Sequence, residues 1–239
     1  MLAKKIPIVW VTGAGRGIGA AIAHAFGSIG AHVILSGRNL AQLEHTTGSI
    51  TRLGYSASFL KCDVSSESSV KRAYKTIVRN YHNVDVLVNN AGITYFRSFK
   101  NTKVRDFDDV LATNLRGAFL CTKSVLPAMM KRNSGTIINI NSVAATTIFE
   151  NSSAYAASKA GLLAMSRGLR FEVRKKGVRV IDILPGAVET LMWSKAERKK
   201  YHAKMMQPED MAEVVVSAYR QLGRVLTEEI IVRPWGGDL

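Results

Sequence analysis

The sequence has 239 residues, of which 47% are hydrophobic and 21% charged, the composition of an ordinary globular protein. No stretch is apolar over the roughly 20 residues that a bilayer span requires, and the first residues lack the pattern of a signal peptide, so we expect a cytoplasmic protein that is not embedded in a membrane. The net charge of +15 favours anionic partners, but the basic residues are scattered and no nucleic-acid-binding motif accompanies them, which argues against nucleic-acid binding.

The two cysteines, Cys62 and Cys121, lie far apart in the sequence and lack the spacing of metal ligands. They are therefore expected to be free thiols of a reducing compartment, and no metal site is predicted. No composition break, repeat or linker divides the chain. Its length fits one large α/β domain that spans residues 1–239.

Apolar runs alternate with helical patterns along the chain, which is typical of βαβ units and a parallel sheet. The first half begins with a continuous apolar run that ends at glycines, as a buried strand does. The elements predicted in this half are a strand over 6–12, a helix over 17–28, a strand over 31–36, a helix over 40–53, a strand over 56–61, a helix over 66–81 and a strand over 85–88.

The second half continues the alternation. Right-handed crossovers then predict a doubly wound parallel sheet of about seven strands, with helices on both faces and ligands at the carboxyl ends of the strands. The elements predicted here are helices over 104–115 and 118–131, the second interrupted by Pro127, a strand over 136–140, a helix over 153–176 that Gly177 ends, a strand over 178–184, helices over 192–206 and 208–222, and a strand over 229–232.

Glycines recur through residues 12–19, between the first predicted strand and the first predicted helix. Glycine lets the backbone turn tightly and approach a pyrophosphate, and the start of the helix offers unpaired N–H groups to it. A plain strand-to-helix turn would not need so many glycines. The spacing Gly-x-x-x-Gly-x-Gly resembles that of the short-chain dehydrogenase/reductase family, which implies a Rossmann-type fold. The residues expected to contact the cofactor here are Gly13, Gly15, Arg16, Gly17, Ile18 and Gly19.

The residues after the second predicted strand indicate which dinucleotide binds. An NAD site places a carboxylate there to hold the ribose 2′-OH, whereas this sequence has Gly37 followed by Arg38. Arg38 and Arg16 can instead hold a 2′-phosphate through charge-assisted hydrogen bonds. This pattern is similar to that of the NADP-preferring members of the family, so NADP is the predicted cofactor.

The resemblance extends to two further turns. It implies that Asp63 and Val64 contact adenine, although Asp63 is also a candidate for the cap of the next helix. It also implies that Asn90, Ala91 and Gly92, after the fourth strand, pass beside the ribose; by itself, such a turn is unremarkable.

Tyr155 and Lys159 lie four residues apart at the start of the predicted helix over 153–176, so their side chains share one helical face. A nearby ammonium lowers the pKa of a phenol, and we expect Lys159 to prepare Tyr155 for proton transfer in this way. Ser142, just past a strand, can hydrogen-bond a substrate oxygen. In the family these residue types, with an asparagine, form a proton relay, which implies that Asn114, Ser142, Tyr155 and Lys159 are catalytic. Tyr155 and Lys159 are also expected to contact the cofactor, with Lys159 holding the nicotinamide ribose.

Each of these residues has a simpler interpretation alone: a surface Tyr-x-x-x-Lys pair, a loop hydroxyl and a polar residue within a helix. All four residues, however, follow the expected strands in the order that the family shows, and chance does not readily produce such an arrangement. One departure from the family is Asn141 before Ser142, where a small residue is common.

The resemblance also implies that Pro185, Gly186 and Thr190 contact the nicotinamide. The following segment, at about 190–206, is predicted to form a substrate lid rich in methionine and aromatic residues. An amphipathic helix that packs on the core is an equally good interpretation of it. Residues 144–149 are expected to form the opposite wall.

The predicted activity is reduction of a carbonyl to an alcohol, or the reverse, with NADP(H). The chain looks most like the 3-oxoacyl-acyl-carrier-protein reductases of fatty acid biosynthesis, and a homodimer or homotetramer is implied. Carbonyl reductases and sugar or polyol dehydrogenases of the same family are alternatives, as is a nonenzymatic NADP-sensing protein. The basic residues expected to dock an acidic acyl-carrier protein are Lys131, Arg132, Arg174, Lys175 and Lys176.

Overall fold

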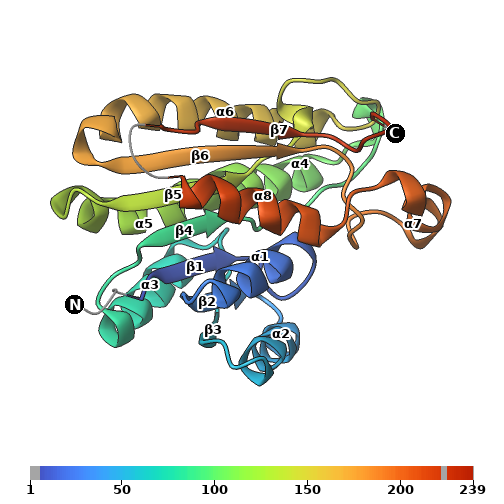
Figure 1. The fold of residues 1–239 in the computed structure, drawn as a ribbon. Coiled ribbons are helices and arrows are strands. Elements are labelled where there is room, and N and C mark those ends of the chain that lie inside the picture. The colour runs from blue at the N-terminus through green and yellow to red at the C-terminus, as the bar shows by residue number, and fades with distance from the viewer. Residues whose placement is uncertain (1–5, 222–224, 239) are drawn as a thin grey trace.

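The computed structural model describes residues 6–221 and 225–238 and has a parallel sheet at its centre (Figure 1). The sheet has seven strands in the order β3-β2-β1-β4-β5-β6-β7, and every neighbouring pair is parallel. The strand order reverses between β1 and β4, and this is the point where a doubly wound sheet binds ligands. The predicted doubly wound α/β fold is confirmed.

The strands are short apolar runs because both faces of the sheet are covered by helices. In β4, for example, all four residues are buried. The prediction located every strand to within two residues at either end. The strands are β1 (Ile8–Thr12), β2 (His32–Gly37), β3 (Ala57–Lys61), β4 (Val86–Asn89), β5 (Gly135–Ile140), β6 (Val178–Pro185) and β7 (Glu229–Val232).

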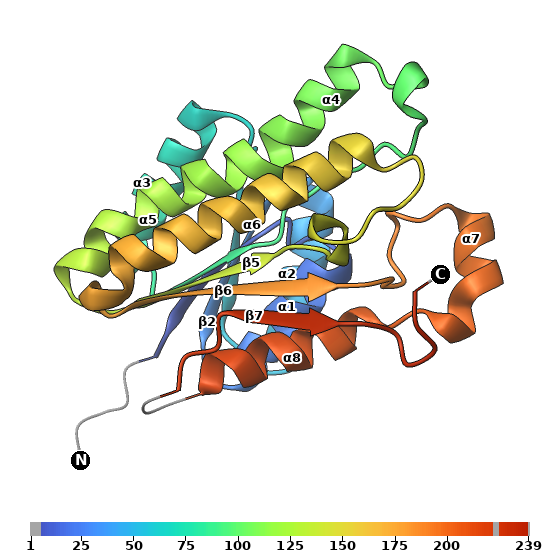
Figure 2. The same cartoon turned by 90° about the horizontal axis from the view of Figure 1, so that it is seen from above.

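The helices form a layer on each face of the sheet, and Figure 2 shows α5 and α6 on one face and α8 on the other. Two apolar clusters fill the space between the sheet and its helices. One contains Phe26 of α1 and lies between the sheet and the helices α1 and α8. The other contains Trp10 of β1 and lies between the sheet and the helices α3 and α5. The longer helices are α1 (Gly17–Ser28), α2 (Leu40–Arg52), α3 (Glu67–Tyr81), α4 (Val104–Leu111), α5 (Gly117–Lys131), α6 (Ser153–Val173), α7 (Lys195–Tyr201) and α8 (Pro208–Arg220). None of the helices in the described ranges combines the length and apolar character of a membrane span.

Three helix predictions need correction. The helix over 118–131 is not interrupted at Pro127, because α5 continues through it. Val125 and Met129 flank Pro127 and are fully packed inside, so burial of this face outweighs the lost backbone hydrogen bond. The helix over 104–115 instead ends at Leu111 and continues as a π-helical turn, Ala112–Arg116.

The predicted helix over 192–206 is shorter, because α7 begins after Ser194. The Ser194 side chain accepts from the backbone N–H of Glu197, and the Glu197 carboxylate accepts from the Ser194 N–H. This capping box, Ser-x-x-Glu, was the sequence signal for the boundary. The helix over 153–176 ends in a 3-10 turn, Arg174–Lys176, and Gly177 stops it with φ of 64°, as predicted. The end predicted for the helix over 208–222 lies outside the described residues.

Candidate active site

A cleft of about 1280 Å³ opens at the carboxyl ends of the strands. It exceeds the roughly 300–1,000 Å³ of ordinary small-molecule sites, so it has room for a dinucleotide together with a substrate. Asn114 is the one predicted site residue that does not line it. The predicted residues that line the cleft are Gly13, Gly15, Arg16, Gly17, Ile18, Gly19, Arg38, Asp63, Val64, Asn90, Ala91, Gly92, Ser142, Tyr155, Lys159, Pro185, Gly186 and Thr190.

The glycine loop follows β1 and packs directly against the turn after β4. Gly13 has φ of 65°, and a Cβ on it would lie 2.8 Å from Cα of Ala91. A Cβ on Gly19 would lie 2.4 Å from Nδ2 of Asn90. Only glycine fits at these two positions, because any side chain would collide with the neighbouring turn. The first turn of α1 carries no side-chain cap, so its N–H groups remain available to an anion.

Asn90 holds the glycine loop in place, with help from a residue that the sequence reasoning missed. The Asn90 amide donates to the carbonyl oxygens of Thr12 (2.9 Å) and Gly13 (3.1 Å). The Thr12 hydroxyl accepts from the N–H groups of Asn90 and Ala91, both at 3.1 Å, and donates to the carbonyl of Val88. Thr12 therefore ties the ends of β1 and β4 together. Its only sequence signal was its place directly before the glycines.

Arg16, Arg38 and Gly37, the last residue of β2, all line the cleft. Both arginine side chains are exposed, and neither forms an ion pair within the part of the chain that the structure describes. The carboxylate of Asp63 accepts from the backbone N–H and the hydroxyl of Ser65. Asp63 is thus not the cap of α3, a role that Ser66 fills. The cleft therefore presents the cations Arg16 and Arg38 to a ligand, while the Asp63 carboxylate is engaged in hydrogen bonds with Ser65.

The Lys159 ammonium is buried and is hydrogen-bonded to the backbone of β5. Its Nζ donates to the carbonyl oxygen of Ile140 at 2.8 Å and lies 5.7 Å from the centre of the Tyr155 ring. Burial lowers the pKa of Lys159 to about 8, and the negative charge of Asp182 opposes that shift. Lys159 can therefore exchange a proton near neutral pH.

Burial raises the pKa of Tyr155 above its ordinary value, and a hydrogen bond with Ser142 partly offsets this effect. The net shift of the Tyr155 pKa is therefore upward, opposite to the direction expected from the neighbouring Lys159 alone. Helical spacing does place the two side chains on one face, but Nζ is drawn to the Ile140 carbonyl. The phenol stays protonated at neutral pH and is a proton donor.

Ser142 and Asn114 approach this pair from two other elements. The Ser142 hydroxyl, just past β5, accepts from the N–H of Ala144 at 3.1 Å. Asn114 is 1% exposed and sits in the π-helical turn, a distortion that is frequent at functional sites. Its amide exchanges two hydrogen bonds with the backbone of Ile93 and donates to the Ser158 hydroxyl. Asn114 thus fastens the loop after β4 to α6.

Asn114 and Lys159 both approach the backbone of Gly92. A Cβ on Gly92 would lie 3.4 Å from Oδ1 of Asn114 and 3.9 Å from Nζ of Lys159. The two polar atoms therefore border the same backbone position, although they come from different helices. The structure brings all four predicted catalytic residues to one region, with Asn114 one layer behind the other three.

Aromatic rings line the cleft beside Tyr155. The Phe96 ring centre lies 6.4 Å from that of Tyr155 and 5.8 Å from that of Trp193, the last pair being stacked. Trp193 belongs to the predicted lid, whereas Phe96, in the loop after β4, was missed by the sequence reasoning. The only hint was the aromatic pair Tyr95-Phe96 in a loop. This wall suits a flat, apolar substrate.

The predicted docking residues do not border the cleft. They follow the carboxyl ends of α5 and α6, which lie at the amino ends of the strands, on the opposite side of the sheet (Figures 1 and 2). Two of them are also engaged, since Arg132 donates to the carbonyl of Val84 and Arg174 pairs with Glu228. The basic cluster Lys131, Arg132, Arg174, Lys175 and Lys176 therefore offers no docking surface at the mouth of this cleft.

Comparison with known proteins agrees with this geometry. The model of the short chain dehydrogenase family matches residues 7–201. The chain is 40% identical to a sepiapterin reductase of Chlorobaculum tepidum, over 97% of this chain and 98% of the relative. Among solved structures, a metagenomic short-chain oxidoreductase in complex with NADP has a TM-score of 0.85 and 33% identity, with 95% of this chain and 96% of that chain covered. A variant of the actinorhodin polyketide ketoreductase with NADPH has a TM-score of 0.89 and 30% identity, with 98% of both chains covered.

Proposed function

This chain belongs to the short-chain dehydrogenase family of oxidoreductases, and we propose that it reduces a carbonyl group to an alcohol with NADPH. One observation carries the proposal: Tyr155, Ser142 and Lys159 meet in a cleft that the glycine loop and two arginines also border. A proton donor, a hydrogen-bond donor for the substrate oxygen and a dinucleotide site are thus present in one place.

The arginine end of the cleft favours NADPH over NADH. Arg16 and Arg38 are exposed cations, each without an ion-pair partner among the described residues, and they suit a 2′-phosphate. The carboxylate that would hold a ribose 2′-OH is replaced by Gly37. Two similar solved proteins hold NADP or NADPH. When bound, the cofactor supplies the hydride.

The protein residues manage the proton and the charge on oxygen. Tyr155, held protonated by burial, donates its phenolic proton to the carbonyl oxygen of the substrate. Ser142 hydrogen-bonds the same oxygen as negative charge develops on it. Lys159, with a pKa of about 8 and its Nζ 5.7 Å from the centre of the Tyr155 ring, is the nearby acid that resupplies this proton to the phenolate by way of solvent. Asn114 holds the loop that borders this group through the backbone of Ile93.

A flat aromatic carbonyl compound is the substrate class that we propose. Phe96 stacks on Trp193 and lies beside Tyr155, and a flat ring packed against this aromatic wall would present a carbonyl side chain to the phenol. Trp193 lies in the segment 190–206, which we propose as the lid. A relative that covers nearly the whole chain is a sepiapterin reductase, which supports this class. A 3-oxoacyl-acyl-carrier-protein substrate is the weaker candidate, because the basic residues expected to dock the carrier protein do not border the cleft.

Activity measurements test the proposal directly. Oxidation of NADPH, followed by its absorbance, is compared for sepiapterin, an aromatic diketone, an aliphatic ketone and a 3-oxoacyl thioester. We expect the highest kcat/KM with one of the two aromatic compounds. A preference for the thioester would overturn the aromatic substrate class, and inactivity with all four would contradict the assigned reaction.

Tyr155→Phe removes the proton donor and leaves the cleft intact. We expect kcat to fall by about 10²–10⁴-fold, which is the usual contribution of general acid catalysis, while NADPH still binds. Tyr74→Phe is the matched control, since it deletes a phenol hydroxyl from α3, away from the cleft, and should leave kcat unchanged. Binding is measured by NADPH fluorescence titration. Near-normal turnover by Tyr155→Phe would refute the role of Tyr155.

A further inference from the structure

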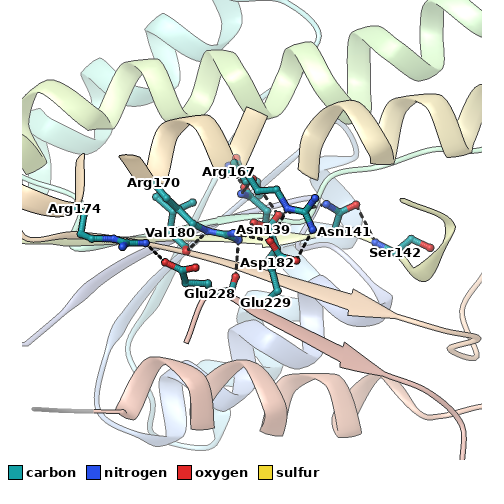
Figure 3. A network of polar contacts seen from close by, with 12 residues as sticks. Asn139, Asn141, Ser142, Arg167, Arg170, Arg174, Val180, Asp182, Glu228 and Glu229 are labelled. Atoms are coloured by element: carbon teal, nitrogen blue, oxygen red, sulfur yellow. Dashed lines mark hydrogen bonds and ion pairs between the residues drawn. The ribbon is translucent and has the colours of Figure 1, made fainter. Parts of the chain in front are cut away.

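A chain of buried polar contacts runs from α6 and β7 through β6 to the catalytic serine (Figure 3). The Arg170 guanidinium donates to Oδ2 of Asp182 at 2.5 Å and to Glu229 at 2.7 Å. Oδ1 of Asp182, which is fully buried, accepts from the Ser166 hydroxyl at 3.0 Å and from Nδ2 of Asn141 at 3.3 Å. Asn141 is one position at which this sequence departs from the pattern that the family resemblance implies.

Asn141 is the last link between this network and Ser142. Its Oδ1 accepts from the backbone N–H of Ser142 at 3.1 Å, and its own N–H donates to the carbonyl of Ile183 at 2.7 Å. The side chain is 3% exposed, so water does not compete effectively for these contacts. The backbone of Ser142 is therefore held by an amide that is itself held by β6.

The charge of Asp182 determines which way the Asn141 amide faces. A carboxylate can only accept hydrogen bonds, so the NH₂ group of Asn141 must face it. The amide oxygen then faces the Ser142 N–H, the one donor within its reach in the described network. Arg170 in turn fixes the Asp182 carboxylate, using its remaining N–H groups on Glu229 and on the carbonyls of Val180 and Glu228.

We propose that Asn141 is a positioning residue for Ser142, and that Asp182 sets the orientation of the Asn141 amide. The inference rests on the proposed role of Ser142. It adds that the contacts from Asp182 through Asn141 hold the backbone of Ser142 and so position the Ser142 hydroxyl. Asn141 touches neither substrate nor cofactor in this proposal. Its removal should lower kcat through Ser142 and leave NADPH binding unchanged.

The test compares Asn141→Ala with a control on the same strand. Asn139 is 2% exposed and also bridges two neighbours, accepting from Asn89 at 2.9 Å and donating to Ser166 at 2.8 Å. It reaches Asp182 only through Ser166, whose own hydroxyl still donates to Asp182 without it, and it has no hydrogen bond with Asn141 or Ser142. Asn139→Ala therefore loses a similar buried amide. We expect Asn141→Ala to reduce kcat by roughly 10- to 100-fold, the scale of a small misplacement at a reacting centre, and Asn139→Ala to leave it unchanged.

Turnover is measured with NADPH and the most active compound of the substrate panel, and kcat is expressed per NADPH-binding site from the fluorescence titration. This normalisation removes any unfolded fraction. Equal kcat values for Asn141→Ala and Asn139→Ala would overturn the proposal. If the alanine variants do not fold, Asn141→Ser and Asn139→Ser replace them under the same criterion.

A double-mutant cycle separates positioning from an independent effect. If Asn141 acts through Ser142, the Ser142→Ala change should cost much less in the Asn141→Ala background than in the wild-type protein. Costs that multiply would overturn the inference. A wild-type kcat for Ser142→Ala alone would instead refute the proposed role of Ser142. The two failures are thus distinguishable.

Discussion

Gly37 ends β2 beside Arg38, and the absence of a side chain there leaves the cofactor choice to the arginines. A Cβ on Gly37 would make only ordinary contacts, the nearest being 3.6 Å from the Leu43 side chain, and the residue does not have a positive φ. A larger residue therefore fits at this position. The glycine is a matter of ligand recognition more than of folding.

Gly37→Asp should shift the preference from NADPH towards NADH. The introduced carboxylate would repel a 2′-phosphate and accept from a ribose 2′-OH, so we expect the ratio of kcat/KM for NADPH to that for NADH to fall by about 10-fold or more. Gly168→Asp, on the exposed face of α6 with nothing within 4 Å of its Cβ, adds the same charge elsewhere as a control. An unchanged ratio would contradict the assigned position of the 2′-phosphate.

Spacing along the chain placed Tyr155 and Lys159 on one helical face, and their order after the predicted strands, with the family resemblance, marked them as candidates. Their protonation behaviour was not predictable in the same way. Desolvation of Tyr155 depends on the surrounding segments, and the contact that captures Lys159 comes from Ile140, on β5. Both effects act between residues that are distant in sequence.

At the scale of elements, β7 depends on ion pairs with α6. Glu229 accepts from Arg167 at 2.8 Å and from Arg170 at 2.7 Å, and these contacts lower its pKa to about 2, with the Arg167 hydrogen bond as the largest cause. The edge strand β7 has a half-exposed pattern and pairs only with β6 within the described residues. Electrostatic contacts therefore supplement a small apolar interface.

The pH dependence of stability should reveal the Glu229 contacts. A carboxyl whose folded pKa is lowered stabilises the protein above its unfolded value, near 4.5, and this contribution is lost as the pH falls towards about 2. Glu229→Gln should thus reduce the free energy of unfolding by about 2 kcal/mol at neutral pH, after allowance for solvent screening, and by much less near pH 2. Denaturant unfolding at a series of pH values measures both.

Glu213→Gln, on an exposed position of α8, is the control, since Glu213 forms no ion pair in the described ranges. It should leave the free energy of unfolding nearly unchanged at every pH. A Glu229→Gln effect that stays constant with pH would show that the lost contribution is not the charge of Glu229.

The elements themselves followed well from local patterns, as α1 and β7 illustrate, because apolar periodicity and glycine positions are local properties. The exceptions have tertiary causes or a missed cap. Packing of Val125 and Met129 carries α5 through Pro127, and the Ser194 cap delays the start of α7. Helix propensity, which is a local property, does not include the free energy that tertiary packing adds, and this packing outweighs the hydrogen bond lost at Pro127.

At the scale of the whole molecule, the net charge of +15 should steer anionic cofactors to the cleft. The Debye length falls from about 30 Å at 0.01 M salt to about 8 Å at 0.15 M. We therefore expect KM for NADPH to rise several-fold over this range, with kcat unchanged, in steady-state assays. KM for an uncharged ketone serves as the control and should stay constant. A salt-independent KM for NADPH would argue against steering.

The sequence by itself determined the doubly wound fold, the glycine loop with Arg16, the Gly37-Arg38 end of β2 and the Tyr155–Lys159 pair, because each is marked by residues near one another in the chain. Only the tertiary structure decided that Phe96 meets Trp193, that Asn141 joins Asp182 to Ser142, and that the basic cluster lies across the sheet from the cleft. These relations arise from strand order and from loops that close over long separations. Burial, which raises the Tyr155 pKa, has the same origin, since it is produced by segments that meet only when the sheet has formed.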